Sequence, residues 1–464
     1  MQVKDCQILI VGFARSGLAA TNFLLTRGAQ VTISDIKDHH ELEKSISQLV
    51  GPVRLSLGSH RLEDFLDTDL IVLSPGVPSN LPELKQASEA GIPICNEVEL
   101  AFQFLDGKVI GVTGSNGKTT TTTLIGELFK KAPGHCVVAG NIGSPLIDFV
   151  SRPPSEGGTP TTFVVELSSF QLENIRKFKC DTALLLNLSP DHLDRHKDFL
   201  DYRRVKERIF LNQGSSDHAI LNADNTHTMK MAHGRKAPVF LFSRKQCLSD
   251  GVFVNEEMIQ ISYRGIREKL LPVREIALRG NHNLENVLAA TAAGFLSGLD
   301  RNDMIETFRT FRGVEHRLEP VRELNGVVYY NDSKATNVNS TEQALKSFSE
   351  PLILLMGGKD KGMDFTVIRS LVAQKVKKLF IIGTASEKIS EALGEVVSTV
   401  QTRDLAEAVR LANETARPGD AVLLSPGCSS FDMFDDFEHR GRIFKQLVLS
   451  LKGKNTDSSS KEAE

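Results

Sequence analysis

The sequence predicts an α/β protein of about three domains, built on doubly wound and mostly parallel sheets. The chain has 464 residues, and at roughly 150 residues per domain this length corresponds to about three domains. Short runs rich in Val, Ile and Leu, ending near Gly, Ser or Thr, alternate with amphipathic stretches. This alternation is typical of buried parallel strands connected by helices.

Apolar runs typical of strands and amphipathic segments typical of helices occur along most of the sequence. The strand-like runs are QILIVG (7–12), DLIVLS (69–74), KVIGVT (108–113), TFVVEL (162–167), TALLLNL (182–188), PLILLMG (351–357), KLFIIG (378–383) and AVLLS (421–425). The clearest helical segments are Thr119–Lys131, Asn283–Gly298 and Asp404–Arg417. Between 220 and 272 short alternating strands such as VFLFS and VFVNEEMIQIS indicate a β-rich annex.

Several stretches read as joints, loops or tails. Domain joints are expected near 96–99 and 311–315. SRPPSEGGTPTT (151–162) reads as an exposed loop. Residues 452–464 are polar, and we expect a disordered tail there.

Composition excludes several classes of protein. With Lys+Arg 55 and Asp+Glu 58 the formal net charge is −3. The chain therefore lacks the excess of basic residues that is typical of proteins that bind nucleic acid. No run approaches ~18 apolar residues, so a membrane span is not expected. The six Cys stand apart, without a CxxC pair, and the N-terminus has no signal pattern. We therefore expect a cytoplasmic protein with free thiols.

The first Gly-rich turn follows the first strand-like run. Gly12, Ala14 and Gly17 give G-x-A-x-x-G, one glycine short of the dinucleotide fingerprint, and Asp35 ends the next strand. The turn either holds a nucleotide or diphosphate over a helix N-terminus or is a tight βα turn that needs small residues. The pattern alone leaves both open, and Ala14 makes an oxidoreductase the weaker interpretation.

The second Gly-rich turn, GVTGSNGKTTTT (111–122), is more specific. Gly114 and Gly117 allow backbone N–H groups to converge on phosphate, Lys118 can reach the β- and γ-phosphates, and the Thr119 hydroxyl can ligate Mg²⁺. Val112 stands where the common phosphate-loop pattern has Gly. The turn predicts a nucleoside triphosphate site and leaves kinase, GTPase, motor and ligase open.

Three further segments carry charged groups. Glu166 ends a buried strand, where a carboxylate is costly unless a cation such as Mg²⁺ is near. SPDHLDRH (189–196) follows the next strand and offers His192, and DYRRVKERIF (201–210) carries Lys206. From spacing alone, the better interpretation of the first segment is a solvated polar loop, and that of the second is a surface lysine.

Together these motifs resemble the ATP-dependent Mur ligases of bacterial peptidoglycan synthesis, over residues 1 to about 450. The motifs that carry the resemblance are GVTGSNGKTT, GNIG (140–143), ELSSFQLE (166–173), SPDHLDRH, YRRVKERIF, GNHNLENVLAA (280–290), EHRLE (315–319), NDSKATN (331–337), GGKDKG (357–362) and SPGCSSFDMFDDFEHRG (425–441). ELSSFQLE and NDSKATN look like the family member that adds D-glutamate.

The resemblance implies three domains and a reaction. Residues 1–97 would form a Rossmann-like domain that binds the UDP end of the substrate, 98–312 a P-loop ATPase-like domain with the β-rich annex, and 313–451 a Rossmann-like domain that brings the amino acid. The implied activity is ligation of D-glutamate to UDP-N-acetylmuramoyl-L-alanine through an acyl phosphate and a tetrahedral intermediate. The implied cofactors are ATP and two Mg²⁺ ions, and we expect a monomer.

The resemblance also implies catalytic and ATP-binding residues. Lys118, Glu166, His192, Lys206 and Lys334 match catalytic positions. Thr119, Glu166, His192 and Lys206 match metal ligands, with Lys206 converted by CO₂ to an anionic carbamate. That reaction needs a neutral amine, whose lowered pKa Arg203 and Arg204 could promote. The ATP-binding positions are Gly114, Ser115, Asn116, Gly117, Lys118, Thr119, Thr120, Asn283, Asn286, Arg317 and Asp332.

The substrate-binding positions implied by the resemblance are Arg15, Ser16, Asp35, Lys37, Gly76, Asn141, Ser168, Thr336, Lys361, Ser430 and Phe437. The GGKDKG segment departs from the expected GGDGKG, so Lys359 competes with Lys361 for its role. Other functions stay open: a Mur-type or folylpolyglutamate-type ligase for another amino acid, a P-loop GTPase or kinase, a nicotinamide oxidoreductase, or a non-catalytic scaffold.

Overall fold

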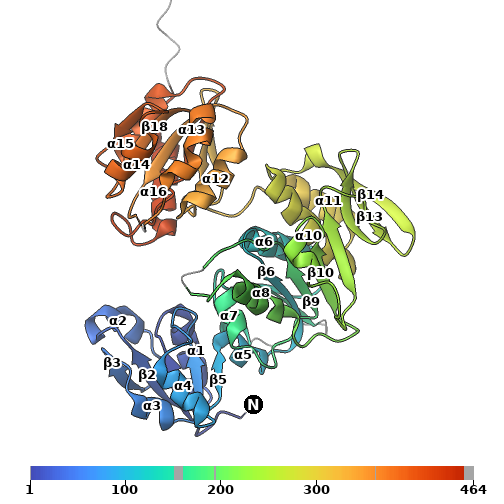
Figure 1. Cartoon of the computed structure of the whole chain (residues 1–464), viewed down its shortest axis with the longest axis vertical. Helices are drawn as coiled ribbons and strands as arrows, with labels where there is room; N and C mark the ends of the chain where they lie inside the picture. The colour runs from blue at the N-terminus through green and yellow to red at the C-terminus, as the bar shows by residue number, and fades with distance from the viewer. Residues whose placement is uncertain (1, 151–159, 193–194, 361, 454–464) are drawn as a thin grey trace, which may run out of the picture. The chain divides into compact units, whose positions relative to one another are not determined.

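The computed structural model describes residues 2–150, 160–192, 195–360 and 362–453 (Figure 1). It divides into two compact units, one of Met1–Ile276 with His282–Thr310 and the other of Ala277–Asn281 with Phe311–Glu464. The described residues form three sheets of mainly parallel strands with helices between them, so the predicted α/β class is confirmed.

The first sheet is parallel throughout, in the order β3-β2-β1-β4-β5. This order, with crossover helices, is the Rossmann order 3-2-1-4-5-6 without its last strand. Its strands are β1 (Gln7–Val11), β2 (Gln30–Asp35), β3 (Arg54–Leu57), β4 (Leu70–Leu73) and β5 (Ile94–Asn96), and its helices are α1 (Arg15–Leu25), α2 (His39–Ile46), α3 (Leu62–Leu66), α4 (Pro82–Glu89) and α5 (Glu97–Phe102).

The second sheet has nine strands in the order β14-β13-β12-β11-β10-β9-β6-β8-β7. The strands are β6 (Gly107–Thr113), β7 (Cys136–Gly140), β8 (Thr161–Glu166), β9 (Thr182–Leu185), β10 (His218–Asn222), β11 (Val239–Ser243), β12 (Gly251–Asn255), β13 (Met258–Tyr263) and β14 (Ile266–Pro272). The helices and 3₁₀ turns are α6 (Lys118–Phe129), η1 (Leu146–Phe149), α7 (Ser169–Glu173), α8 (Phe199–Glu207), η2 (Arg208–Phe210), α9 (Thr226–Met229), η3 (Val273–Glu275), α10 (Asn281–Leu296) and α11 (Arg301–Thr310).

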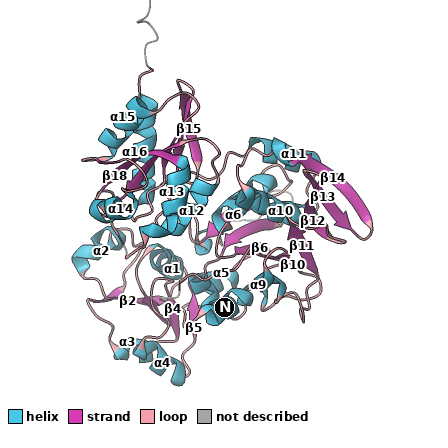
Figure 2. Cartoon of the chain, turned by 45° about the horizontal axis from the view of Figure 1, so that its top comes forward, coloured by secondary structure: helices cyan, strands magenta, loops and turns pink. Residues whose placement is uncertain are grey.

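The predicted annex is β-rich, but it is part of the central sheet. β10 and β11 pair in parallel with their neighbours, and only β12, β13 and β14 pair antiparallel. The reason is burial: the consecutive residues Ala219, Ile220 and Leu221 of β10 are all buried, as in a strand covered on both faces. Figure 2 shows the β13–β14 hairpin beside α11 at the end of this sheet.

Helix α6 forms despite an unfavourable sequence. It begins KTTTTT, and β-branched Thr lowers intrinsic helix propensity because its χ1 rotamers are restricted. Thr119 to Thr122 are all buried. Packing therefore holds this helix, and Gly117, at φ 84°, supplies the left-handed residue at its start.

The third sheet lies in the second unit, in the order β15-β16-β20-β17-β18-β19, with only β15 antiparallel to its neighbour. The strands are β15 (Glu319–Leu324), β16 (Val327–Asn331), β17 (Leu352–Gly357), β18 (Val376–Ile382), β19 (Thr399–Gln401) and β20 (Ala421–Leu424). Its helices and 3₁₀ turn are α12 (Val338–Lys346), η4 (Phe365–Ile368), α13 (Arg369–Lys375), α14 (Ser386–Leu393), α15 (Leu405–Thr415) and α16 (Phe437–Ser450).

Some expectations concern residues that are only partly described. Residues 151–159 of the predicted loop and 454–464 of the predicted tail lie outside the described residues. Within the part of the chain that is described, no helix is both long and apolar enough to cross a bilayer.

Candidate active site

The phosphate loop connects β6 to α6 at the carboxyl edge of the central sheet. Gly114 has φ 155° and Gly117 φ 84°, and a Cβ on Gly117 would lie 2.2 Å from Asn286 Oδ1. The Asn187 side chain and carbonyl, just after β9, accept hydrogen bonds from Asn116 N (2.8 Å) and Ser115 N (3.0 Å). These two hydrogen bonds to Asn187 fix the backbone of the loop directly before the N-terminus of α6. A loop fixed at a helix N-terminus is suited to binding phosphate.

Lys118 begins α6 and turns its ammonium back over the loop. Its Nζ donates to Gly114 O at 2.8 Å and to Ser115 O at 2.9 Å. Thr119 and Thr120 follow in the first helical turn, and both are buried. The structure therefore gathers every residue predicted from this loop at one helix end, with the cation and the Thr119 hydroxyl in the same turn.

Glu166 ends β8, the strand adjacent to β6. Only 2% of the residue is exposed; Oε1 accepts a hydrogen bond from Asn141 Nδ2 at 2.8 Å, and Oε2 is buried without a hydrogen-bond partner. An orphaned carboxylate oxygen in the interior is costly unless a cation neutralises it. Its oxygen chemistry and position fit Mg²⁺.

Lys206 lies on α8 and is 1% exposed. Its Nζ donates to Thr113 Oγ1 at 3.0 Å and to Gly114 O at 3.1 Å, beneath the phosphate loop. Burial first, and then the charge of Lys118, lower the pKa of this amine well below its usual value, while Asp191 and Glu166 raise it. The expected neighbours Arg203 and Arg204 are not among the causes, because burial and a cation distant in sequence act instead.

His192 and Ser168 lie near this group on loops of the same domain. His192 has φ 52°, its ring packs edge-on against Phe170 at 5.1 Å, and its Nε2 lies 3.7 Å from Asp191 Oδ2. Ser168 caps α7, and its hydroxyl accepts a hydrogen bond from Gln171 N. Ser168 therefore has a structural task at α7.

Asn283 and Asn286 lie in the first turns of α10. Asn286 Nδ2 donates to Asn283 Oδ1 at 3.1 Å, and Asn286 Oδ1 accepts from Thr121 Oγ1 at 3.2 Å. Because Gly117 packs against the same Oδ1, α10 contacts the phosphate loop directly.

The first Gly-rich turn is closed by groups of the protein itself. Asp35 Oδ2 accepts from Phe13 N at 2.6 Å and Oδ1 from Lys37 N at 2.9 Å, while Ser74 Oγ donates to Gly12 O at 2.7 Å. A Cβ on Gly17 would lie 2.1 Å from Gly12 O. The turn therefore needs its small residues for packing.

The other residues predicted from this domain lie around the turn. Lys37 and Gly76 are exposed and Ser16 is half-buried. Arg15 Nη1 donates to Gly143 O at 2.8 Å, so it connects the first turn to the GNIG loop, and Gly76 O accepts from Arg195 Nη1 at 3.2 Å.

A second group of predicted residues belongs to the other unit. Asp332 is buried; its Oδ2 accepts from Ser425 Oγ at 2.8 Å, and burial raises the pKa of this carboxyl to about 7. Lys334 Nζ lies 5.6 Å from the centre of the Phe437 ring. Thr336 N donates to Lys334 O at 2.9 Å.

Three further predictions concern the same unit. Ser430 is buried and its carbonyl accepts from Met433 N. Arg317 has a buried Nε without a hydrogen-bond partner. Lys361 lies outside the described residues.

Sequence reasoning missed two supports of these groups. Asn187 holds the phosphate loop, and its position directly after β9, next to β6, is a signal that could have indicated it. Arg440 is fully buried and donates to Ser333 and to the carbonyl of Cys428. Nothing in the local sequence of α16 indicates that Arg440 would be buried.

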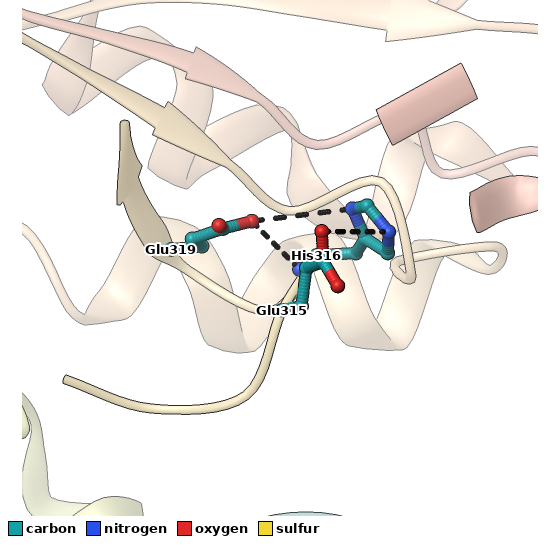
Figure 3. Close-up of side chains that lie close together, drawn as sticks. All are labelled: Glu315, His316 and Glu319. Atoms are coloured by element: carbon teal, nitrogen blue, oxygen red, sulfur yellow. Dashed lines mark hydrogen bonds and ion pairs between the residues drawn. The ribbon is translucent and has the colours of Figure 1, made fainter. Parts of the chain in front are cut away.

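Glu315, His316 and Glu319 bring three potential metal-ligand atoms within 4.8 Å of one another (Figure 3). Lys445 Nζ contacts both carboxylates, at 3.0 Å from Glu315 and 2.5 Å from Glu319. Asn331 Nδ2 lies 2.8 Å from His316 Nδ1 and donates to it. The charges and the ring nitrogen are already engaged, so the cluster is an ion-pair network that fixes the turn before β15.

Comparison with known proteins assigns the three sheets to one family. Family models match for a Mur ligase MurD-like N-terminal domain over 6–96, a Mur ligase middle domain over 112–294 and a Mur ligase glutamate ligase domain over 316–428. Among curated relatives, the UDP-N-acetylmuramoylalanine--D-glutamate ligase of Acidobacterium capsulatum is 46% identical, covering 98% of both chains. That of Koribacter versatilis is 45% identical over 97% of this chain and 99% of its own.

Solved structures support the fold. The UDP-N-acetylmuramate-alanine ligase MurC of Thermotoga maritima matches with a TM-score of 0.59 at 18% identity, covering 96% of this chain and 100% of that one. A MurF structure from Acinetobacter baumannii matches with a TM-score of 0.59 at 15% identity, covering 95% and 93%.

Proposed function

The chain belongs to the Mur ligase family, and we propose that it is the ATP-dependent ligase that joins D-glutamate to UDP-N-acetylmuramoyl-L-alanine. The relatives that support this choice carry that activity in their names and align over nearly the whole chain. In the structure, the observation that carries it is the grouping of half-buried Lys118 with buried Glu166 and Lys206 around the phosphate loop.

The first step activates a poor acyl donor. The alanyl carboxylate attacks the γ-phosphorus of ATP, and the bond from that phosphorus to the β,γ-bridging oxygen breaks. The products of this step are an acyl phosphate and ADP. The N-terminus of α6 and the Lys118 ammonium bind the phosphates and offset charge that develops on the transferring group.

The second step forms the amide. The neutral amine of D-glutamate attacks the acyl carbon, and the tetrahedral intermediate loses inorganic phosphate while the nitrogen gives up a proton. Lys334 with Thr336, Lys361, Ser430 and Phe437 would bind the dicarboxylate, for which a cation and hydroxyl groups are suited.

Thr119, Glu166, His192 and a carbamate on Lys206 would hold two Mg²⁺ ions. When bound, Mg²⁺ neutralises charge on phosphate oxygens. The uncharged Lys206 Nζ attacks CO₂, a nitrogen–carbon bond forms, a proton leaves to solvent, and the side chain becomes an anionic oxygen ligand. Its burial and lowered pKa favour the neutral amine that this step needs.

The remaining assignments follow the same proposal. Arg15, Ser16, Asp35, Lys37 and Gly76 would bind the UDP end, and Asn141 and Ser168 the muramoyl-alanine part. Asn283, Asn286, Arg317 and Asp332 would contact ATP. We divide the chain into domains at 1–97, 98–312 and 313–451, and expect a cytoplasmic monomer.

A direct assay tests the proposal. Purified protein with Mg²⁺, ATP, UDP-MurNAc-L-Ala and D-glutamate should release phosphate and yield a product whose mass equals the sum of the two joined substrates minus water. Omitting any substrate, or replacing D- by L-glutamate, should abolish both signals. Phosphate release without an amino acid would indicate a simple P-loop hydrolase, and turnover with another amino acid would indicate a different ligase.

A further inference from the structure

The short turn Asn96–Glu99, where β5 meets α5, contacts two segments that carry proposed substrate-binding residues. Asn96 Nδ2 donates to Gln171 O in α7, the helix that Ser168 caps. Glu97 Oε1 accepts from Ile147 N at 2.7 Å in η1, which follows the GNIG loop. One turn of the chain thus supports both segments.

The two glutamates of this turn differ in how they are satisfied. Glu99 accepts three backbone N–H groups, from Arg176, Lys177 and Phe178, at 2.8, 2.8 and 2.9 Å. Glu97 is 1% exposed, and its Oε2 is buried without a hydrogen-bond partner. Glu99 is therefore a well-paired structural carboxylate, whereas Glu97 costs stability where it stands.

The loop that Glu97 supports is the one that carries Asn141. At its start, Asn141 N donates to Glu166 O at 2.9 Å and Asn141 Nδ2 to Glu166 Oε1 at 2.8 Å. In its middle, Gly143 O accepts from Arg15, and Gly140 N donates to Ser144 O at 3.1 Å. At its end, the backbone amides of Leu146 and Ile147 face Glu97. The shape of the loop thus depends on Glu166 at one end and on Glu97 at the other.

We propose that Glu97 is a positioning residue for the UDP-MurNAc-L-Ala site: by accepting a hydrogen bond from the Ile147 amide of η1 it holds the 141–145 loop so that Asn141 can contact both Glu166 and the substrate. This inference rests on the proposed function. Burial, with Asp148 adding to it and the two η1 amides opposing it, raises the pKa of Glu97 to about 7. The role requires an acceptor oxygen at this place and not a negative charge.

Two substitutions separate the acceptor from the charge. Glu97→Met keeps the volume of the side chain but offers no acceptor to Ile147 N. Glu97→Gln keeps an acceptor oxygen and removes the charge. We expect Glu97→Met to raise the Kd of UDP-MurNAc-L-Ala about tenfold, which corresponds to about 1.4 kcal/mol, and to leave the KM of ATP within about twofold. Glu97→Gln should bind like the wild type.

The matched control is Asp64, a second buried carboxylate of the first domain with one unpaired oxygen. It forms an ion pair with Arg54 on β3 of the first sheet. Asp64→Leu should lower the thermal unfolding temperature without changing the Kd of the UDP substrate.

The measurements are calorimetric titration of UDP-MurNAc-L-Ala, steady-state kinetics with each substrate varied, and thermal unfolding. Equal loss of affinity for ATP and the UDP substrate in Glu97→Met, or a Glu97→Gln variant as weak as Glu97→Met, would overturn the inference. If the wild type does not ligate at all, the proposed function fails instead, and the two failures are thereby distinguished.

Discussion

The two Gly-rich turns of the first unit share a strand–turn–helix layout but differ in what satisfies their polar groups. In the first turn, Asp35 and Ser74 bond to the backbone of the turn itself. In the second, Lys118 and Lys206 donate hydrogen bonds to carbonyl groups of the loop. Glu166 ends the adjacent strand, and its Oε2 lacks a hydrogen-bond partner. In the first turn, the side chains of Asp35 and Ser74 and the turn's backbone satisfy one another's hydrogen bonds. In the second turn, a buried carboxylate oxygen remains without a partner, and a metal-bound triphosphate would complete the arrangement of charges.

The largest expected effect falls on Lys206 at the second turn. Lys206→Ala should reduce turnover below about 10⁻³ of the wild type, because it removes the amine that would become a metal-binding carbamate. Added acetate or formate should restore part of it by supplying a carboxylate. Arg204→Ala, an exposed neighbour on α8, is the control and should retain activity. Full activity of Lys206→Ala in a phosphate-release assay would refute the metal-ligand role.

Lys118 should show the next largest effect. Lys118→Ala should lower kcat by about 10³, since one preorganised cation at the transferring phosphoryl group is lost, with binding of the UDP substrate unchanged. Lys130→Ala, just after the other end of α6, should behave like the wild type. The measurement is kcat for phosphate release together with calorimetry of the UDP substrate, and a kcat within a few-fold of the wild type would contradict the assignment.

Exchanging one glycine in each turn should impair the use of a different substrate in each case. Gly117→Ala places a Cβ against Asn286 Oδ1 at φ 84°, so the KM of ATP should rise about tenfold. Gly17→Ala drives a Cβ into Gly12 O, so the KM of the UDP substrate should rise instead, by a similar factor. If both variants impair the same substrate, the two turns do not serve separate ligands.

The smallest effect concerns stability. Asp35→Asn replaces an acceptor of two backbone N–H groups by a side chain with a single acceptor oxygen, and should lower the free energy of unfolding by about 1 kcal/mol. Glu166→Gln removes an unpaired buried charge and should leave stability equal or higher while abolishing turnover. Urea unfolding monitored by circular dichroism checks both, and a destabilised Glu166→Gln would mean that its carboxylate is already well paired.

Local sequence patterns predicted the parallel sheets and the phosphate loop, but they did not predict the residues that hold the site in place through distant hydrogen bonds. Buried runs such as residues 108–113, and the Gly spacing before Lys118, are short-range signals, so the parallel sheets and the loop could be expected from them. Asn187 and Glu97 act through hydrogen bonds to residues 50 or more positions away, and Lys206 becomes buried only through packing against β6. No local pattern carries that information, because it arises from the pairing of distant strands.

The threonine run of α6 has a consequence for the order of folding. Since its intrinsic helicity is low, a peptide spanning 107–131 should be largely disordered in water, and the helix should form only against its neighbours. One neighbour is Asn286, which bonds to Thr121 from α10. During synthesis, the emerging chain would therefore lack a nucleotide pocket until the ribosome has extended it by more than 160 residues beyond that threonine.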